Sequence, residues 1–415
     1  MKLLRPFLPL VFCTAAALAQ SDDAAFLAKF ESTFEQGGAL PAKDFVPKAS
    51  LSGRLHTVQA QMENDGLRNT YALETPDGVT EVTGTPALLE RIREIYALDY
   101  LRGLSTTDEF KKAVAGAGKA KVESLAGVAR DPFGTVKNVP KGASRFFGRL
   151  SESTRAGRSE GESGSVQRLL GVSQAKAKLA AQLGVSPYTG NEELQRELTK
   201  AARAMAGGGL VVNLAASSVS GGAGAVLTVA GVNQTLQSTL TNSTPEDLRA
   251  ANRKKLLALG VAPALADEFL LHPWFSPWHE TITTEALARI GVNPTAFLAD
   301  AVKALTAEDA FFFQRLAQIL AQCHATAAPL RALRFNGGLV TALDQNGTLI
   351  VPVSLDYGLW AERAARRVEE FAEIGRHREE IKALALWTDG RLSERLSAEL
   401  ANRGIAYRTE VLAKP

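Results

Sequence analysis

Histidine and aromatic side chains are concentrated in one short segment, residues 272–280, which reads His-Pro-Trp-Phe-Ser-Pro-Trp-His-Glu. A zinc peptidase needs two histidines one helical turn apart, with a glutamate directly after the first, so that both imidazoles reach one metal ion. His279 and Glu280 provide the start of that pattern, but Thr283 occupies the position of the second histidine. The segment therefore predicts no metal site.

Two other interpretations of this segment stay open. Its prolines and aromatic residues are typical of a corner between two helices. Alternatively, its tryptophans provide stacking surface at the lip of a ligand-binding site. The candidate contacts of such a site are His272, Trp274, Trp278, His279 and Glu280.

A second group of candidate contacts lies at a predicted strand-to-helix junction. Asp356 and Tyr357 follow the predicted strand, and Trp360 comes shortly after them. Binding sites often gather at the carboxyl ends of strands in α/β folds. One hypothesis is therefore a hydrolase-type enzyme with its site near His279 or Asp356.

Complete catalytic motifs are absent from the sequence. It contains no nucleophile elbow, Gly-rich phosphate loop, dinucleotide fingerprint or calcium loop. Cys323 and His324 are neighbours in a predicted helix, where their side chains project about 100° apart, so they are not expected to form a nucleophile and base pair. We expect a buried thiol beside a surface imidazole. The sequence thus predicts no catalytic residue, no metal and no cofactor.

Residues 110–158 are strongly basic, with 11 Lys and Arg against three acidic residues. One interpretation is a segment attracted to anionic lipid head groups, with phenylalanines as apolar anchors. The other is a solvated linker or surface helix whose charge is balanced elsewhere. The candidate membrane contacts are Lys137, Lys141, Arg145, Phe146, Phe147 and Arg149.

Residues 204–245 carry no charge and are rich in Gly, Ala, Ser and Val. Small residues let helices approach closely, in membranes or in soluble proteins. Each of the two apolar pieces in this segment is shorter than the roughly 20 residues that a membrane span requires. A buried helical hairpin is therefore the first interpretation, and membrane association is the alternative.

The first 19 residues have the pattern of a cleavable signal peptide. Lys2 and Arg5 precede an apolar stretch, and Ala17 and Ala19 frame a cleavage site. Removal of the leader leaves 45 basic residues against 44 acidic ones. Because a nucleic-acid-binding protein needs a basic face, this balance argues against a nucleic-acid partner. Cys323 is then the one remaining cysteine, so no internal disulfide is possible.

The order of predicted helices and strands that would position these residues indicates an α+β protein. A small N-terminal β hairpin or meander over 56–83 precedes a helix capped by Thr85, with Pro86 in its first turn. These belong to an N-terminal α/β piece, residues 20–104, followed by a basic, Gly/Ser-rich connecting segment over 105–165.

A mostly α-helical centre is predicted over residues 166–327. The spacing of Thr189 and Glu192, and the sequences at Thr244, Ser276 and Thr306, are typical of helix starts. A C-terminal α+β domain over 328–415 is predicted in the order β-β-α-β-α-β. Its first two strands, 333–343 and 348–355, flank an Asn346-Gly347 turn in which both residues are expected to adopt positive φ.

Four segments make the chain resemble an uncharacterised family of exported bacterial proteins. These segments are residues 64–78, 131–136, 275–277 and 355–360. The resemblance covers most of the mature chain and implies export, but it implies no activity, cofactor or partner. The family pattern does not call for His279 or Glu280 after the third segment.

These observations favour an exported, periplasmic binding or scaffold protein of the cell envelope without committed catalytic activity. One alternative is a peripheral membrane or envelope-assembly protein that uses the basic and uncharged segments. The hydrolase described above is the other. The expected partner is a cell-envelope protein or a lipid surface.

Overall fold

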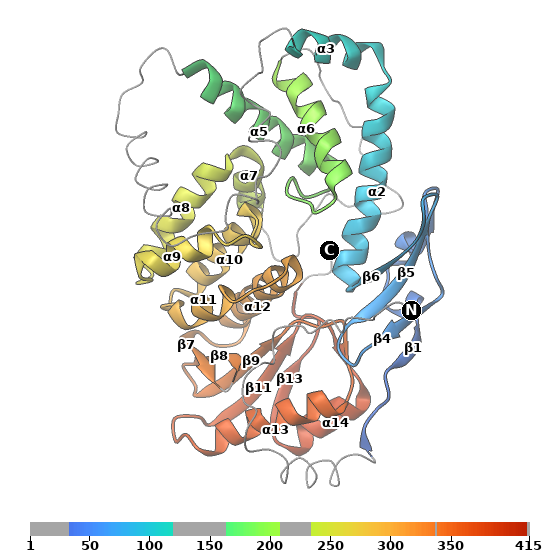
Figure 1. The fold of residues 1–415 in the computed structure, drawn as a ribbon. Coiled ribbons are helices and arrows are strands. Elements are labelled where there is room, and N and C mark those ends of the chain that lie inside the picture. The colour runs from blue at the N-terminus through green and yellow to red at the C-terminus, as the bar shows by residue number, and fades with distance from the viewer. Residues whose placement is uncertain (1–32, 119–162, 208–233, 337, 413–415) are drawn as a thin grey trace, which may run out of the picture.

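A computed structural model describes residues 33–118, 163–207, 234–336 and 338–412 (Figure 1). This part of the chain has an antiparallel sheet near the N-terminus, a central group of helices and a second sheet at the C-terminal end. The prediction of an α+β protein is confirmed. The leader lies outside the described residues, so its cleavage stays a prediction.

The N-terminal sheet contains the predicted meander. In β5, alternate residues such as Tyr71 and Leu73 are buried, and they face the first half of α2. The strand order is β1-β4-β5-β3-β2, and β6 pairs with β5 along its length. The strands are β1 (Gly38–Pro41), β2 (Ser52–Gly53), β3 (His56–Val58), β4 (Gln61–Asn64), β5 (Asn69–Thr75) and β6 (Gly78–Thr83).

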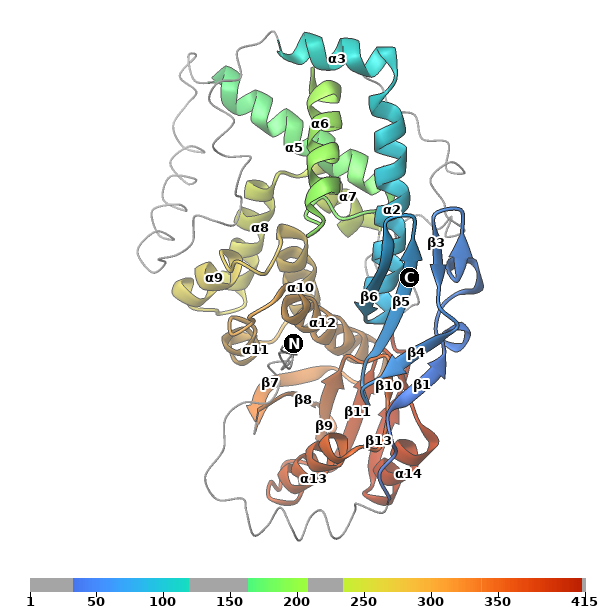
Figure 2. The same ribbon diagram turned by 45° about the vertical axis from the view of Figure 1, so that its right-hand side comes forward.

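Helix α2 (Thr85–Ser105) joins this sheet to the central helices, as Figures 1 and 2 show. Leu88 and Ile92 near its start pack on the sheet, whereas Ala97 and Leu101 pack against α3, α5 and α6. The prediction that Thr85 caps this helix is wrong. Gly84 is the capping residue, and the Thr85 hydroxyl instead bonds to the Tyr71 hydroxyl at 2.7 Å.

The central helices begin largely where local sequence signals predict. Thr244 and Thr306 each form the expected capping box, with Asp247 and Asp309, and Ser276 caps α10. The helices are α3 (Asp108–Gly118), α5 (Ser163–Leu183), α6 (Glu192–Ala206), α7 (Gln234–Asn242), α8 (Pro245–Ala258), α9 (Pro263–Leu270), α10 (Pro277–Ile290), α11 (Thr295–Ala301) and α12 (Ala307–Thr326).

The start of α6 differs from the expected capping box. Asn191 caps this helix by accepting a hydrogen bond from the Leu194 amide at 3.2 Å. The Thr189 hydroxyl instead donates to Glu94 of α2. The Thr189 side chain, which the local pattern predicted as the helix cap, therefore forms a tertiary contact instead.

The C-terminal sheet has the order β13-β11-β9-β8-β7, in which β7, β8 and β9 are antiparallel and β9, β11 and β13 are parallel. Helix α12 packs on one face and α13 and α14 pack on the other (Figure 1). Its elements are β7 (Leu330–Asn336), β8 (Leu339–Asp344), β9 (Thr348–Val353), α13 (Glu362–Arg376), β11 (Ala383–Thr388), α14 (Glu394–Asn402) and β13 (Ile405–Arg408), with the short pair β10 (Tyr357–Gly358) and β12 (Arg391–Leu392) beside them.

Two details of this sheet correct the sequence analysis. The strand expected over 333–343 is a hairpin of β7 and β8, with Gly338 at φ +82° in its turn. In the next turn, Gly347 alone has positive φ, at +85°, and Asn346 does not. The Asp344 carboxylate accepts hydrogen bonds from the amides of Asn346 and Thr348, which holds the turn without that second left-handed residue.

Candidate functional site

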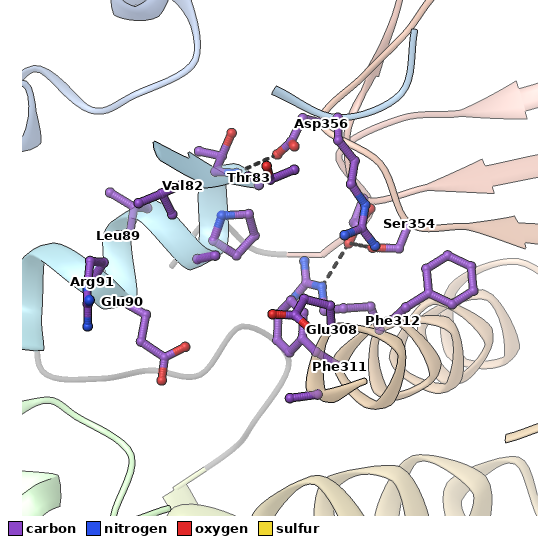
Figure 3. Close-up of a pocket in the computed structure, with 18 of the residues that line it drawn as sticks. Val82, Thr83, Leu89, Glu90, Arg91, Glu308, Phe311, Phe312, Ser354 and Asp356 are labelled. Carbon is purple, nitrogen blue, oxygen red and sulfur yellow. Dashed lines mark hydrogen bonds and ion pairs between the residues drawn. The ribbon is translucent and has the colours of Figure 1, made fainter. Parts of the chain in front are cut away.

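A cavity of about 510 Å³ lies where the N-terminal sheet, the central helices and the C-terminal sheet meet (Figure 3). We call it the junction cavity. Its walls are β6, the first half of α2, the loop 186–191, the starts of α10 and α12, and the loops after β9 and β11. Cavities that bind small molecules commonly measure about 300–1,000 Å³ and occur between domains.

The floor of the cavity is held by a buried ion pair. Arg315 Nε of α12 lies 2.8 Å from Asp389 Oδ2, and the two side chains are 9% and 5% exposed. The same carboxylate accepts hydrogen bonds from the Ser354 hydroxyl at 2.9 Å and the Leu355 amide at 3.0 Å. These bonds join α12 to the carboxyl ends of β9 and β11. This pair was not predicted from the sequence, because no local spacing connects its two residues.

Asp356 is a predicted contact residue that does line the cavity. Its carboxylate accepts hydrogen bonds from the backbone amides of Asn69 at 3.1 Å and Thr85 at 2.9 Å. Burial raises the pKa of Asp356, and these bonds oppose the shift. The residue therefore ties the C-terminal sheet to β5 and to the positive end of the α2 dipole.

The other two predicted contacts at this junction lie outside the cavity lining. The Tyr357 ring packs edge-on against Phe45, with centroids 5.5 Å apart. Trp360 is fully buried, and its indole N–H donates to the Thr33 hydroxyl at 3.2 Å. The guanidinium of Arg403 lies 4.8 Å from the Trp360 ring. Both aromatic residues thus serve packing between the N-terminal segment and the C-terminal sheet.

His279 lines the cavity from the first turn of α10. Burial lowers its pKa to about 4, and a hydrogen bond to the Trp274 backbone partly offsets that effect. The imidazole is therefore neutral at neutral pH. Its Nδ1 atom is fully buried and has no hydrogen-bond partner among the described residues. A neutral imidazole with a bare nitrogen presents one unsatisfied position.

Glu280 does not share the cavity with His279, although the two are adjacent. It is fully buried and binds Arg249 of α8, with Nε–Oε2 at 3.0 Å and Nη2–Oε1 at 3.1 Å. Burial raises the pKa of Glu280 to about 7, and Arg249 opposes the shift. Because successive helical residues project about 100° apart, one side chain reaches the cavity and its neighbour reaches α8.

The remaining predicted contacts of the 272–280 segment also lie outside the lining. Trp278 is buried against Tyr188, with ring centroids 6.3 Å apart. Trp274 is 45% exposed, and the His272 ring packs edge-on against Phe275 at 5.5 Å. In the described ranges, no three His, Cys, Asp or Glu residues are placed to hold a metal ion.

Two glutamates of α2, four positions apart, line the cavity and were missed by the sequence analysis. Glu94 is buried and bonded to Arg91, at 3.0 Å, and to Thr189. Burial, with a smaller contribution from Glu94, raises the pKa of Glu90 to about 7, and Arg93 opposes the shift. Acidic residues at helical spacing among the buried apolar positions Leu89 and Ile92 were the available signal.

Helix α12 supplies the facing wall of the cavity. Glu308 lies in its first turn, and Phe311 and Phe312 follow one turn later. Figure 3 shows the Glu90 and Glu308 side chains reaching into the space between α2 and α12. The cavity therefore combines aromatic surface with acidic groups on two walls.

Cys323 is buried, as expected, and burial raises the pKa of its thiol to about 12. Its neighbour His324 accepts a hydrogen bond at Nδ1 from the Leu330 amide at 3.1 Å. The thiol is therefore protonated at neutral pH, and the imidazole is engaged with the start of β7. This geometry does not make a nucleophile and base pair.

The candidate membrane segments fall largely outside the described residues. This holds for Lys137, Lys141, Arg145, Phe146, Phe147 and Arg149, and for positions 208–233 of the uncharged segment. Within the ranges that the structure describes, every helix is too short or too polar to cross a bilayer. Association with a lipid surface stays a prediction.

Comparison of the chain with protein-family models, with curated proteins and with solved structures found no match. The resemblance to exported bacterial proteins therefore stays a prediction as well.

Proposed function

We propose that this chain is an exported binding protein that holds a small organic molecule in the junction cavity. The observation that carries the proposal is a cavity of about 510 Å³ whose walls come from three separate parts of the chain. Its lining has the usual character of a binding site, in which apolar and aromatic surface surrounds a few polar groups.

The internal bonding of the cavity supports a binding role. Asp356 and Asp389 are held by backbone amides, and Asp389 also by Arg315, so the walls are connected before any ligand arrives. A preformed site loses less conformational entropy when it binds a ligand.

The same contacts weigh against the hydrolase alternative. The carboxylates of Asp356 and Glu280 already accept two or more hydrogen bonds each, so neither is free to act as a general base. Within the described ranges, His279 has no carboxylate partner that would orient it as a base in the manner of a triad. The pattern of occupied groups favours binding over hydrolysis.

The proposal is tested by filling the cavity. Ala307 is an exposed residue of α12 in the lining, so Ala307→Trp should narrow the cavity without disturbing a core. Ala325→Trp places the same side chain at an exposed position of the same helix outside the lining.

A library of water-soluble organic compounds is screened by thermal unfolding against the wild type and both variants. A ligand at about 100 times its Kd stabilises the folded state by about 2.7 kcal/mol, which moves the transition by several degrees. We expect compounds that stabilise the wild type and Ala325→Trp but not Ala307→Trp. If every compound that stabilises the wild type stabilises Ala307→Trp equally, or if none stabilises the wild type, the proposal is wrong.

A further inference from the structure

Resting on the proposed function, we infer that the ligand of the junction cavity carries a protonated amine that lies between Glu90 and Glu308, with an apolar body against Phe311 and Phe312. The inference concerns the chemical class of the ligand. It depends on which polar groups of the cavity are already occupied and which are not.

Most charged groups of the lining have partners within the protein. Asp389 is bonded to Arg315, Asp356 to two backbone amides, and Glu94 to Arg91 and Thr189. Because each of these carboxylates is already bonded, none of them needs a ligand to satisfy it.

The unoccupied groups near α2 and α12 are acceptors. Glu90 and Glu308 form no ion pair and accept no side-chain hydrogen bond among the described residues. His279 also lines the cavity, but its unpartnered Nδ1 is buried beneath the surface, so we assign no ligand contact to that atom. Since ionised carboxylates only accept hydrogen bonds, a group that satisfies them must donate.

The net charge of the lining points the same way. Eight carboxyl groups and four guanidinium groups line the cavity. Of the guanidinium groups, Arg315 and Arg91 pair with carboxylates, and Arg391 donates to the Asp44 carbonyl at 2.6 Å. Arg68 is the fourth, in the turn before β5. A concave surface with excess carboxylates concentrates cations.

An ammonium group fits the α2–α12 end better than the other donors do. It carries three donors and no acceptor, so it can donate to both glutamates at once. A cation beside an aromatic ring is also stabilised electrostatically, and Phe311 already has the Arg315 guanidinium 6.0 Å from its centroid. Phe312, Leu89 and Val82 leave apolar surface for the body of the ligand.

The surroundings of Glu90 make this binding pH-dependent. Glu94 and Arg93 of α2 act on Glu90 electrostatically. Arg91 lines the cavity from α2, Glu308 and Arg315 from α12, and Tyr188 and His279 from the loop 186–191 and from α10. Burial keeps Glu90 partly protonated near neutral pH in the empty cavity. A bound cation favours its ionised form, so affinity should increase as the pH rises from about 6 to 8.

The test compares three probes of one shape, 2-phenylethylamine, 2-phenylethanol and 3-phenylpropionate, by calorimetric titration of the mature full-length chain. We expect the amine to bind about tenfold or more tightly than the alcohol or the carboxylate, because hydrogen bonds between charged partners are strong. Glu90→Gln with Glu308→Gln should weaken amine binding about tenfold or more. Glu109→Gln, at an exposed position of α3 outside the lining, is the matched control.

The outcomes separate this inference from the proposed function. If the alcohol or carboxylate binds as tightly as the amine, or if the double variant binds the amine as the wild type does, the ammonium inference is wrong. If Ala307→Trp abolishes binding of that alcohol, carboxylate or amine and Ala325→Trp does not, the cavity remains a binding site. If none of the three binds, this inference fails, and the library screen alone decides the proposed function.

Discussion

The buried pair of Arg249 and Glu280 offers a sharp test of the structure, through the variant Arg249→Met. Glu280 is fully buried and the Arg249 side chain is 22% exposed. Methionine keeps most of the apolar stem of arginine and removes the charge. Breaking a buried ion pair by removing one partner typically costs about 3–5 kcal/mol, because it leaves an uncompensated charge.

The loss of stability in Arg249→Met should depend on pH, because the buried Glu280 carboxylate becomes neutral when it takes up a proton. Burial raises the pKa of Glu280 in the folded protein to about 7, although the positive charge of Arg249 lowers it in part. Removal of Arg249 raises that pKa further. A carboxyl group with a raised pKa contributes stability that is present below the unfolded pKa, near 4.5, and is lost as pH rises through the folded value. We therefore expect a loss of about 3 kcal/mol at pH 8 and a smaller loss at pH 5.

Urea unfolding followed by tryptophan fluorescence at the two pH values measures this difference. Lys254→Met, at an exposed position of the same helix, is the control and should change stability by less than about 0.5 kcal/mol. An equal loss for Arg249→Met at both pH values, or a loss no larger than that of the control, would refute the assignment of Glu280 to a buried pair with Arg249.

Three further predictions concern other parts of the chain. Asp356→Ala should destabilise the protein by about 3 kcal/mol and speed amide exchange at Thr85 and Asn69, since two partly buried amides lose their acceptor; unchanged exchange there would contradict this. Cys323 should resist iodoacetamide at pH 8 in the folded protein and react fully in urea, because burial raises the pKa of its thiol to about 12; rapid labelling of the native chain would show that the thiol is accessible. Mass spectrometry of the exported protein should find a chain that begins at Gln20, and recovery of Met1 would rule out cleavage.

Local signals predicted the helix starts that depend on near neighbours. The capping boxes at Thr244 and Thr306 each involve residues three positions apart, so the sequence contains both partners side by side. The start of α2 behaves differently. Its first amide is bonded by Asp356, which lies 271 residues away, and the expected cap, Thr85, bonds to Tyr71 instead.

The candidate site shows the same division. His279 and Asp356 were proposed from composition and position, and the structure places both in the junction cavity. Their neighbours Trp278, Glu280 and Tyr357 lie elsewhere, because adjacent residues of one element point in different directions. Residue types in the sequence indicated the segments that line the cavity, but they did not predict which side chains in those segments face it.

By itself the sequence determined the α+β class and the starts of α8, α10 and α12, because these follow from periodicity and caps over a few residues. The tertiary structure decided which groups meet. It brought Glu90 of α2 and Glu308 of α12 into the lining of one cavity, and it paired Arg315 with Asp389 and Glu280 with Arg249. These contacts depend on packing between elements that are distant in the sequence, and the residues next to each partner in the chain do not predict them.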